Sequence, residues 1–241
     1  MERAGPHRTI HRLIGLGGGV AFVGSLSYFA VSYGRRFDAP PSQSGDTAAP
    51  ILVDLLLFTV FALHHSVFAR GPLKAWIRRT VSPSLERSVY VWLASVLFVI
   101  TCLYWQPVAG TAWHITGAAA LVMTSLQVLG GVWCVVTARR LDVFELAGIR
   151  QVFGMPAHDT PPALDTRGPY AFVRHPIYFG WLLLVWFAPW MNGTRLVFAA
   201  VSTFYLAIAI PLEERELVKV FGSAYKDYRR QVRWRMLPGV Y

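Results

Sequence analysis

The residues best suited to chemistry flank the last two apolar segments of the chain. Arg174, His175 and Pro176 directly precede the apolar run 177–189, and an acidic pair directly follows the run 196–212. A proline suits the first turn of a helix, where its missing N–H costs nothing. Arg174 and His175 are therefore expected at the positive end of that helix, a corner that attracts a carboxylate or a phosphate.

The acidic pair is Glu213-Glu214, placed where the run 196–212 is predicted to end. Acids at a helix C-terminus are disfavoured by about 0.3–1 kcal/mol each, so a cationic or hydroxyl-rich group should offset that cost. The two runs are expected to form an antiparallel hairpin through a turn at 190–194. Because the start of one helix then lies beside the end of the other, we expect Arg174 and His175 within reach of both carboxylates.

The same acids also allow a purely structural interpretation. Arg215 and Lys219 follow them closely and are available as local partners. A salt-bridge cluster at the membrane interface would then need no ligand. The sequence leaves both interpretations open.

The composition predicts an integral membrane protein. The chain of 241 residues is 54% hydrophobic, has a mean hydropathy of +0.42 and contains nine Trp and fifteen Phe, which is far from a soluble domain. We expect an all-α fold, a polytopic transmembrane helix bundle with five to six spans in a single domain, 1–241. The run 177–189 is short for a span of about 20 residues, so a half-inserted helix is its alternative. The six apolar runs are 13–33, 51–69, 88–105, 115–138, 177–189 and 196–212.

The charge pattern predicts the orientation. The net charge is +10, and 20 of the 23 Lys and Arg lie in the segments 1–12, 70–87, 139–176 and 211–241, whereas the other connections carry three. The positive-inside rule then places both termini in the cytoplasm. Acidic membrane lipids, rather than nucleic acid, are the expected partner for this charge.

Cysteine and histidine give no metal or disulfide signal. Cys102 and Cys134 fall inside predicted spans without a CxxC spacing, so buried small hydrophobic residues are expected there. His64 and His65 are neighbours, point to different faces of a helix and cannot chelate as an i, i+4 pair would. No metal site is expected, and the role of these two histidines is left open.

The C-terminal segment predicts an amphipathic helix at the membrane surface. Phe221, Tyr225, Tyr228 and Val232 recur at helical spacing, and basic residues fill the positions between them. Such a helix lies on the cytoplasmic leaflet, either as an anchor or also as a cover for the polar site.

Several of these motifs together resemble the isoprenylcysteine carboxyl methyltransferase superfamily, whose members are integral-membrane enzymes that use S-adenosylmethionine. The resemblance covers about residues 165–238. It rests on Gly168-Pro169-Tyr170, the segment 173–180, Glu213-Glu214, Phe221-Gly222, Tyr225, Tyr228 and Pro238.

The N-terminal half narrows the resemblance to the bacterial methanethiol S-methyltransferases, from about residue 55 onward. The first 50 residues, Ala147 and the segment 155–162 depart from that pattern. The segments that carry it are 65–70 with Lys74 and Trp76, 86–91, 105–107 and 144–152.

The resemblance implies a module at 139–241 that binds S-adenosylmethionine in a bacterial inner membrane. The residues it implies for cofactor binding are Tyr170, Arg174, His175, Pro176, Tyr178, Gly180, Glu213 and Glu214. Its implied catalytic residues are Arg174, which would stabilise a thiolate, or Glu214, which would accept the thiol proton.

The implied reaction converts methanethiol to dimethyl sulfide. A prenylated carboxylate or a lipid amine is the alternative acceptor within the same enzyme class. A non-catalytic membrane protein of the type associated with denitrification genes is the alternative outside it. The sequence does not determine the oligomeric state.

Overall fold

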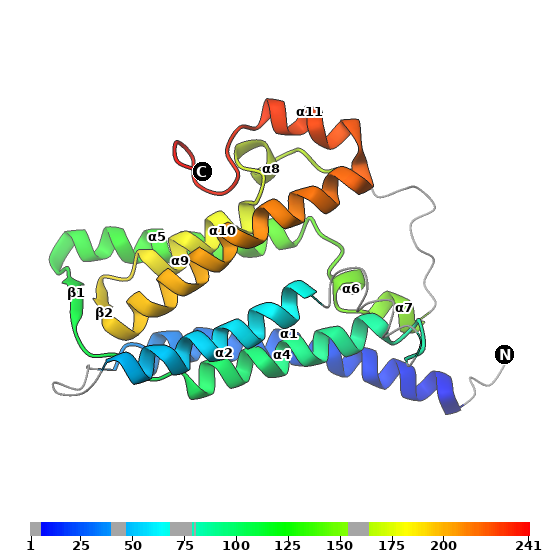
Figure 1. Ribbon diagram of the computed structural model, residues 1–241, viewed down its shortest axis with the longest axis horizontal. Coiled ribbons are helices and arrows are strands. Elements are labelled where there is room, and N and C mark those ends of the chain that lie inside the picture. Colours follow the sequence, from blue (N-terminus) through cyan, green and yellow to red (C-terminus); the bar gives the residue numbers. More distant parts are fainter. Residues whose placement is uncertain (1–5, 40–46, 68–78, 80, 154–163) are drawn as a thin grey trace. The chain divides into compact units, whose positions relative to one another are not determined.

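A computed structural model describes residues 6–39, 47–67, 79, 81–153 and 164–241 of the chain. Helices make up most of this part of the chain (Figure 1). Five helices within it are long and apolar enough to cross a membrane, which confirms the prediction of an all-α, multi-pass membrane protein. These helices are α1 (Pro6–Arg35), α2 (Ala48–Val67), α4 (Glu86–Tyr104), α5 (Gly117–Ala138) and α10 (Gly193–Phe221).

The chain divides into two compact units. The first unit contains α1, α2 and α4 with two short helices, α6 (Val143–Leu146) and α7 (Ile149–Phe153). The second unit contains α5 and α10 with the remaining elements, all from residue 108 onward. The single domain at 1–241 and the cofactor module at 139–241 stay predictions.

In the first unit, α1 and α2 both pack against α4, and α7 packs against α1. The two histidines of α2 meet Tyr90 of α4. The His64 ring stacks on the Tyr90 ring with centroids 5.4 Å apart, and the Tyr90 hydroxyl lies 2.9 Å from His65 Nδ1. Their contacts therefore join two helices. The predicted end of the second span at 68–69, with Arg70, Lys74, Trp76 and the segment 155–162, lies outside the described residues.

The second unit is built on an antiparallel pair, α9 (Pro176–Trp186) and α10, with α5 packed along α9 (Figure 1). Two tryptophans of α9 donate to hydroxyls of α10: Trp181 Nε1 to Ser202 Oγ (3.1 Å) and Trp186 Nε1 to Thr203 Oγ1 (2.8 Å). On the α5 side, a Cβ added at Gly130 would lie 2.5 Å from the carbonyl oxygen of Gly180. Glycine therefore allows the two backbones to touch. The predicted hairpin is present.

The helix α9 has 11 residues and is too short to cross the membrane by itself, so the segment after it adds to its length. The helix rises about 16 Å, and residues 187–190 add at most about 13 Å if extended. Together they approach the roughly 30 Å of bilayer hydrocarbon, although α9 alone does not reach it. Two carbonyls in this irregular stretch are satisfied, because Ala188 accepts from Trp113 Nε1 and Pro189 from the amide of Ile115, both at 2.9 Å.

Two short strands join α9 and α5 at this end, and the sequence did not predict them. The strand β1 (Thr111–His114) pairs antiparallel with β2 (Trp190–Asn192). The pairing places Trp190–Asn192 in a strand where a plain turn at 190–194 was predicted. The Asn192 side chain then caps α10 by accepting from the amide of Arg195 at 2.9 Å.

The helix α10 does not end where it was predicted to end. It continues through Pro211 to Phe221, so the predicted end at Leu212 is wrong. A proline inside a helix leaves the carbonyl four residues earlier without its donor. Here that carbonyl belongs to Ala207, and the hydroxyl of Tyr241 donates to it at 3.1 Å. An aromatic hydroxyl thus replaces the missing main-chain N–H.

The last helix, α11 (Ser223–Gln231), turns away from α10 at Gly222, whose φ of 58° favours glycine. Tyr225 and Tyr228 are buried, whereas Lys226, Arg229 and Arg230 are exposed. The predicted amphipathic helix is therefore present. The segment after it returns to the hairpin, where Met236 packs with Leu182 and Ile210 in a buried cluster.

Candidate functional site

The backbone before α9 is held by the segment that follows α11. The amide of Arg174 donates to the carbonyl of Trp234 at 3.0 Å, and the amide of His175 donates to that of Arg235 at 2.7 Å. Pro176 is the first residue of α9, as the sequence predicts. Residues 174–175 are thus fixed between the start of one helix and a distant part of the chain.

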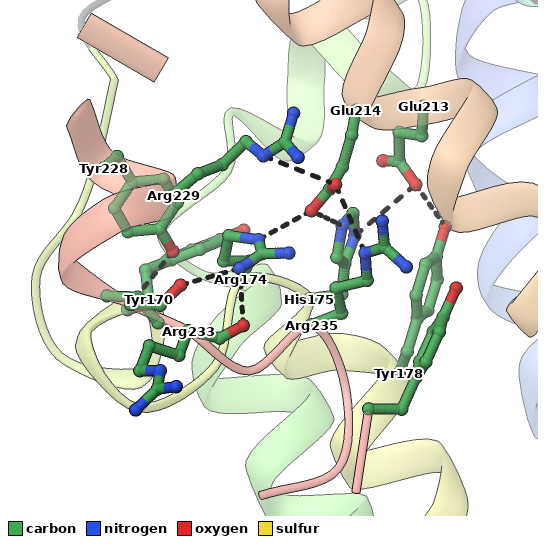
Figure 2. A network of polar contacts seen from close by, with 12 residues as sticks. Tyr170, Arg174, His175, Tyr178, Glu213, Glu214, Tyr228, Arg229, Arg233 and Arg235 are labelled. Carbon is green, nitrogen blue, oxygen red and sulfur yellow. Dashed lines mark hydrogen bonds and ion pairs between the residues drawn. The ribbon is translucent and has the colours of Figure 1, made fainter. Parts of the chain in front are cut away.

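Arg174 and Glu214 form a buried ion pair at the centre of the site (Figure 2). Arg174 Nε donates to Glu214 Oε1 at 2.6 Å, and the two residues are 8% and 2% exposed. Arg174 Nη1 also donates to the carbonyls of Val232 and Arg233, at 2.7 Å each. A buried charge needs this degree of pairing, because an isolated one would cost several kcal/mol. Arg174 therefore lies within reach of Glu214, as the sequence predicts.

A second set of contacts joins His175, Tyr178 and Glu213. Tyr178 donates its hydroxyl to Glu213 Oε2 at 2.9 Å, and the rings of His175 and Tyr178 stack with centroids 5.4 Å apart. His175 Nδ1 lies 3.6 Å from Glu213 Oε2, and His175 Nε2 lies 3.6 Å from Glu214 Oε1. The imidazole thus stands between both carboxylates (Figure 2).

Glu214 also has two arginines from the C-terminal segment near its other oxygen. Arg235 Nε lies 3.4 Å and Arg229 Nε lies 3.8 Å from Glu214 Oε2. Lys219, a partner in the purely structural interpretation, instead pairs with Glu216 at 2.7 Å. The two acids lie inside α10 rather than at its C-terminus. The prediction that the helix dipole disfavours them is therefore wrong.

The aromatic residues around this network hold α11 against α8 (Pro169–Phe172). The hydroxyl of Tyr228 donates to the carbonyl of Tyr170 at 2.7 Å. Burial raises the pKa of Tyr170, Tyr225 and Tyr228 above the ordinary tyrosine value, and the negative charge of Glu214 adds to the rise for Tyr225. The phenols therefore stay neutral donors at physiological pH.

The remaining residue of the predicted set, Gly180, lies on the face of α9 that touches α5. A Cβ added there would lie 2.7 Å from Cys134 Sγ and 2.8 Å from the carbonyl oxygen of Gly130. This contact gives Gly180 a packing role, and the other predicted residues gather at the start of α9 and on α10 and α8. Sequence reasoning did not assign site roles to Tyr228, Arg229, Arg233 and Arg235. Their regular tyrosine and arginine spacing was visible, but backbone carbonyls as partners of Arg174 leave no sequence signal.

Two buried polar atoms near the network have no hydrogen-bond partner among the described residues. They are His175 Nε2 and the hydroxyl of Tyr225, and both residues are at least nine-tenths buried. Leaving such a group unpaired costs about 1–3 kcal/mol, so a bound ligand is a natural partner. Among the residues that the structure describes, no group of three or more His, Cys, Asp and Glu side chains is arranged to hold a metal ion.

Known proteins match this chain over most of its length. A family model described as phospholipid methyltransferase matches residues 113–224. A methanethiol S-methyltransferase of Crocosphaera subtropica is 38% identical over 201 residues, covering 82% of this chain and 78% of the relative. One from Mycobacterium tuberculosis is 36% identical over 226 residues, covering 87% and 92%. Nurim of Danio rerio is 28% identical over 82% of this chain.

No solved structure matches the chain. The relatives confirm the resemblance that the motifs of the sequence suggest, and they make the protein an enzyme that transfers methyl groups. The matched residues 113–224 include both the start of α9 and the acidic pair of α10. The chain belongs to the family of membrane methyltransferases that includes the methanethiol S-methyltransferases.

Proposed function

We propose that this protein transfers a methyl group from S-adenosylmethionine to methanethiol, or a similarly small thiol, and so forms dimethyl sulfide. The observation that carries the proposal is the buried Arg174–Glu214 pair. The segment after α11 covers this pair, and the buried hydroxyl of Tyr225 near it has no hydrogen-bond partner among the described residues. The named activity of the relatives at 36–38% identity supports the choice of thiol.

The donor set fits S-adenosylmethionine. The cofactor carries an ammonium group and ribose hydroxyls, which suit Glu213, whose side chain is 41% exposed and bonded on one oxygen to Tyr178. Arg235, which is partly exposed beside Glu214, suits the carboxylate of the cofactor. When bound, the cofactor would supply an electrophilic methyl group on a sulfonium; a thiolate would attack that carbon in line with the sulfonium sulfur, and S-adenosylhomocysteine would be the leaving group.

In this proposal, some residues of the site hold its elements in position and another accepts the thiol proton. Arg174 donates to Glu214 and to two carbonyls, so its main role is to hold α9, α10 and the C-terminal segment together. Both oxygens of Glu214 already face cations. His175, which lies 3.6 Å from a carboxylate oxygen of Glu213 and of Glu214, is the proton acceptor that we assign to the thiol. Positioning supplies most of the remaining rate, up to about 7–11 kcal/mol.

We also propose that both termini are cytoplasmic and that the protein lies in a bacterial inner membrane. The uneven distribution of Lys and Arg supports this orientation. The start of α9, where Arg174 and His175 lie, then faces the cytoplasm, which contains the cofactor. A reporter fused after Gly110 should read periplasmic and one fused after Tyr241 cytoplasmic. A periplasmic reading at Tyr241 would overturn the orientation.

A lipid amine is the second candidate acceptor, and the description of the matching family model favours it. Membranes that contain the protein should be given S-adenosylmethionine with methanethiol, ethanethiol, a farnesylated cysteine or phosphatidylethanolamine. We expect dimethyl sulfide in the headspace, a slower reaction of ethanethiol and no methylation of the other two. Labelled phospholipid or prenylcysteine without dimethyl sulfide would replace the thiol assignment and keep the methyltransferase class.

A further inference from the structure

A basic pocket lies on the outer side of the network. It is an open hollow of about 440 Å³, lined by Arg174, Lys226, Arg229, Arg230 and Arg233. We propose that this pocket binds the phosphate of an anionic phospholipid headgroup. A single water occupies about 30 Å³ of liquid, so the volume exceeds that of a small ion. It falls within the roughly 300–1,000 Å³ typical of ligand pockets.

The charges in the pocket are only partly neutralised by the protein. Five cationic side chains line it, and two acids contact them: Glu214 lies beside Arg174 and Arg229, and Asp227 binds Arg230. Arginine matches phosphate oxygens with paired N–H donors. The excess positive charge therefore favours an anion with several oxygens.

The position of the pocket in the chain places it at the level of lipid headgroups. α11 begins two residues after the end of α10, which is a membrane-spanning helix. Trp234, beside Arg233, is 37% exposed, and the Arg233 guanidinium lies 6.0 Å from the centre of its ring. Tryptophan is enriched at the membrane interface. The tyrosines of α11 are buried inside the protein, whereas its cations are exposed and can contact anionic headgroups.

The pocket also includes Arg174, which holds the start of α9 against α10 and the segment after α11. Arg174 lies at its inner wall and donates to the carbonyls of Val232 and Arg233. A headgroup bound to Arg229, Arg230 and Arg233 would hold α11 and the following segment at the membrane surface. The pocket therefore adjoins the acidic network, since it is lined by Arg174 and by Arg229, which lies 3.8 Å from Glu214. The lipid proposal does not depend on the identity of the methyl acceptor.

Lipid retention by the purified protein tests the proposal. The full chain would be released from mixed phosphatidylcholine and phosphatidylglycerol membranes, and the lipids that remain bound would be identified by native mass spectrometry. The test variant is the double change Arg230→Gln/Arg233→Gln. Its matched control is Arg215→Gln/Lys219→Gln, which removes the same charge from exposed positions on α10 near the same surface.

We expect the wild type and the control to retain phosphatidylglycerol in preference to phosphatidylcholine. The pocket variant should lose this preference by about 25-fold, or about fivefold for each cation removed from an anionic membrane surface. Thermal unfolding in phosphatidylcholine alone should be the same for the two double variants, which separates lipid loss from misfolding. Equal retention in both variants would overturn the proposal. So would displacement of the lipid by millimolar glycerol phosphate, because the occupant would then be a free phosphate.

Discussion

Tyr225 and Tyr228 lie one helical turn apart on α11 with ring centroids 5.7 Å apart, yet they differ in hydrogen bonding. The hydroxyl of Tyr228 donates to the carbonyl of Tyr170, whereas the hydroxyl of Tyr225 is buried without a partner among the described residues. Two neighbouring phenols with the same burial thus serve different purposes. Tyr228 holds α11 against α8, and we propose that the Tyr225 hydroxyl binds a ligand.

Replacing each tyrosine by phenylalanine should separate these purposes. Tyr228→Phe removes a buried hydrogen bond and leaves a carbonyl unpaired, so we expect a loss of about 1–2 kcal/mol in the free energy of unfolding. Tyr225→Phe removes only an unpaired hydroxyl and should leave stability unchanged or slightly higher, while it weakens binding of S-adenosylhomocysteine. Thermal unfolding in detergent and calorimetric binding are the measurements. Equal destabilisation by both changes would contradict this assignment.

Removing the acid of the central ion pair should cost far more than removing a surface acid. Glu214→Ala leaves Arg174 buried without its carboxylate, and such a loss typically costs about 3–5 kcal/mol. The control, Glu216→Ala, breaks an exposed pair with Lys219 and should cost under about 1 kcal/mol. Glu214→Gln keeps an acceptor for Arg174 and should remain folded. We therefore expect it to retain unfolding cooperativity but to bind S-adenosylhomocysteine at least tenfold more weakly than the wild type. Normal binding by Glu214→Gln would favour the purely structural salt-bridge interpretation.

A proton acceptor at His175 predicts a characteristic pH dependence. His175→Gln should reduce the turnover of methanethiol at pH 7 by about 10²–10⁴-fold, the usual contribution of a general base. The deficit should shrink as the pH rises, because more of the free thiol is then ionised without help. His114→Gln is the control, since His114 lies on β1 at the other end of this unit. A deficit that stays constant with pH would show that His175 positions ligands and does not transfer the proton.

The contact between α5 and α9 offers a test at adjacent glycines. A Cβ at Gly130 would overlap the backbone of α9, so Gly130→Ala should cost about 1–3 kcal/mol through overpacking. A Cβ at Gly131 meets nothing within 4 Å, so Gly131→Ala should be neutral or stabilise by about 0.4–1 kcal/mol. Thermal unfolding of both variants gives the comparison. A Gly130→Ala protein as stable as the wild type would show that the helices do not touch at this point.

The hydrogen bond from Tyr241 to Ala207 can be tested with a double-mutant cycle. Tyr241→Phe should lower stability by about 1–3 kcal/mol, because the carbonyl of Ala207 then has no donor beside Pro211. In a Pro211→Ala background the main-chain N–H at that position returns, and the same change should cost much less. The cycle should therefore give a coupling of at least about 0.5 kcal/mol. Additive effects would mean that the hydroxyl does not replace the missing N–H.

Much of the site could be predicted from residue types, because helix ends and hairpins follow simple rules. Pro176 marked the start of α9, and the hairpin brought Arg174 to Glu214 as expected. The end of α10 was missed because the apolar run stops at Leu212, where charged residues begin, whereas the helix continues to Phe221. A proline inside a helix removes one hydrogen bond, and a hydroxyl from a residue 34 positions away can supply it.

The remaining misses involve backbone groups. The strands β1 and β2 are four and three residues long, too short for an alternating pattern to be detected. The bonds from Arg174 to the carbonyls of residues 232 and 233 depend on where the chain passes, and every residue type carries such a carbonyl. Side-chain identity is therefore informative for the acid, the histidine and the tyrosines. It does not identify the backbone carbonyls that accept hydrogen bonds from Arg174.

The partners of Arg174 are spread along the chain in a way that sets an order for biosynthesis. The guanidinium enters with the start of α9, its carboxylate follows 40 residues later, and its two carbonyls follow only after 58 and 59 residues. Once α9 has been synthesised, the chain therefore carries a cation whose counter-charge is made only 40 residues later. Until residue 233 emerges, that arginine must remain hydrated at the membrane surface. Completion of the site thus requires residues that are made after both arms of the α9–α10 hairpin.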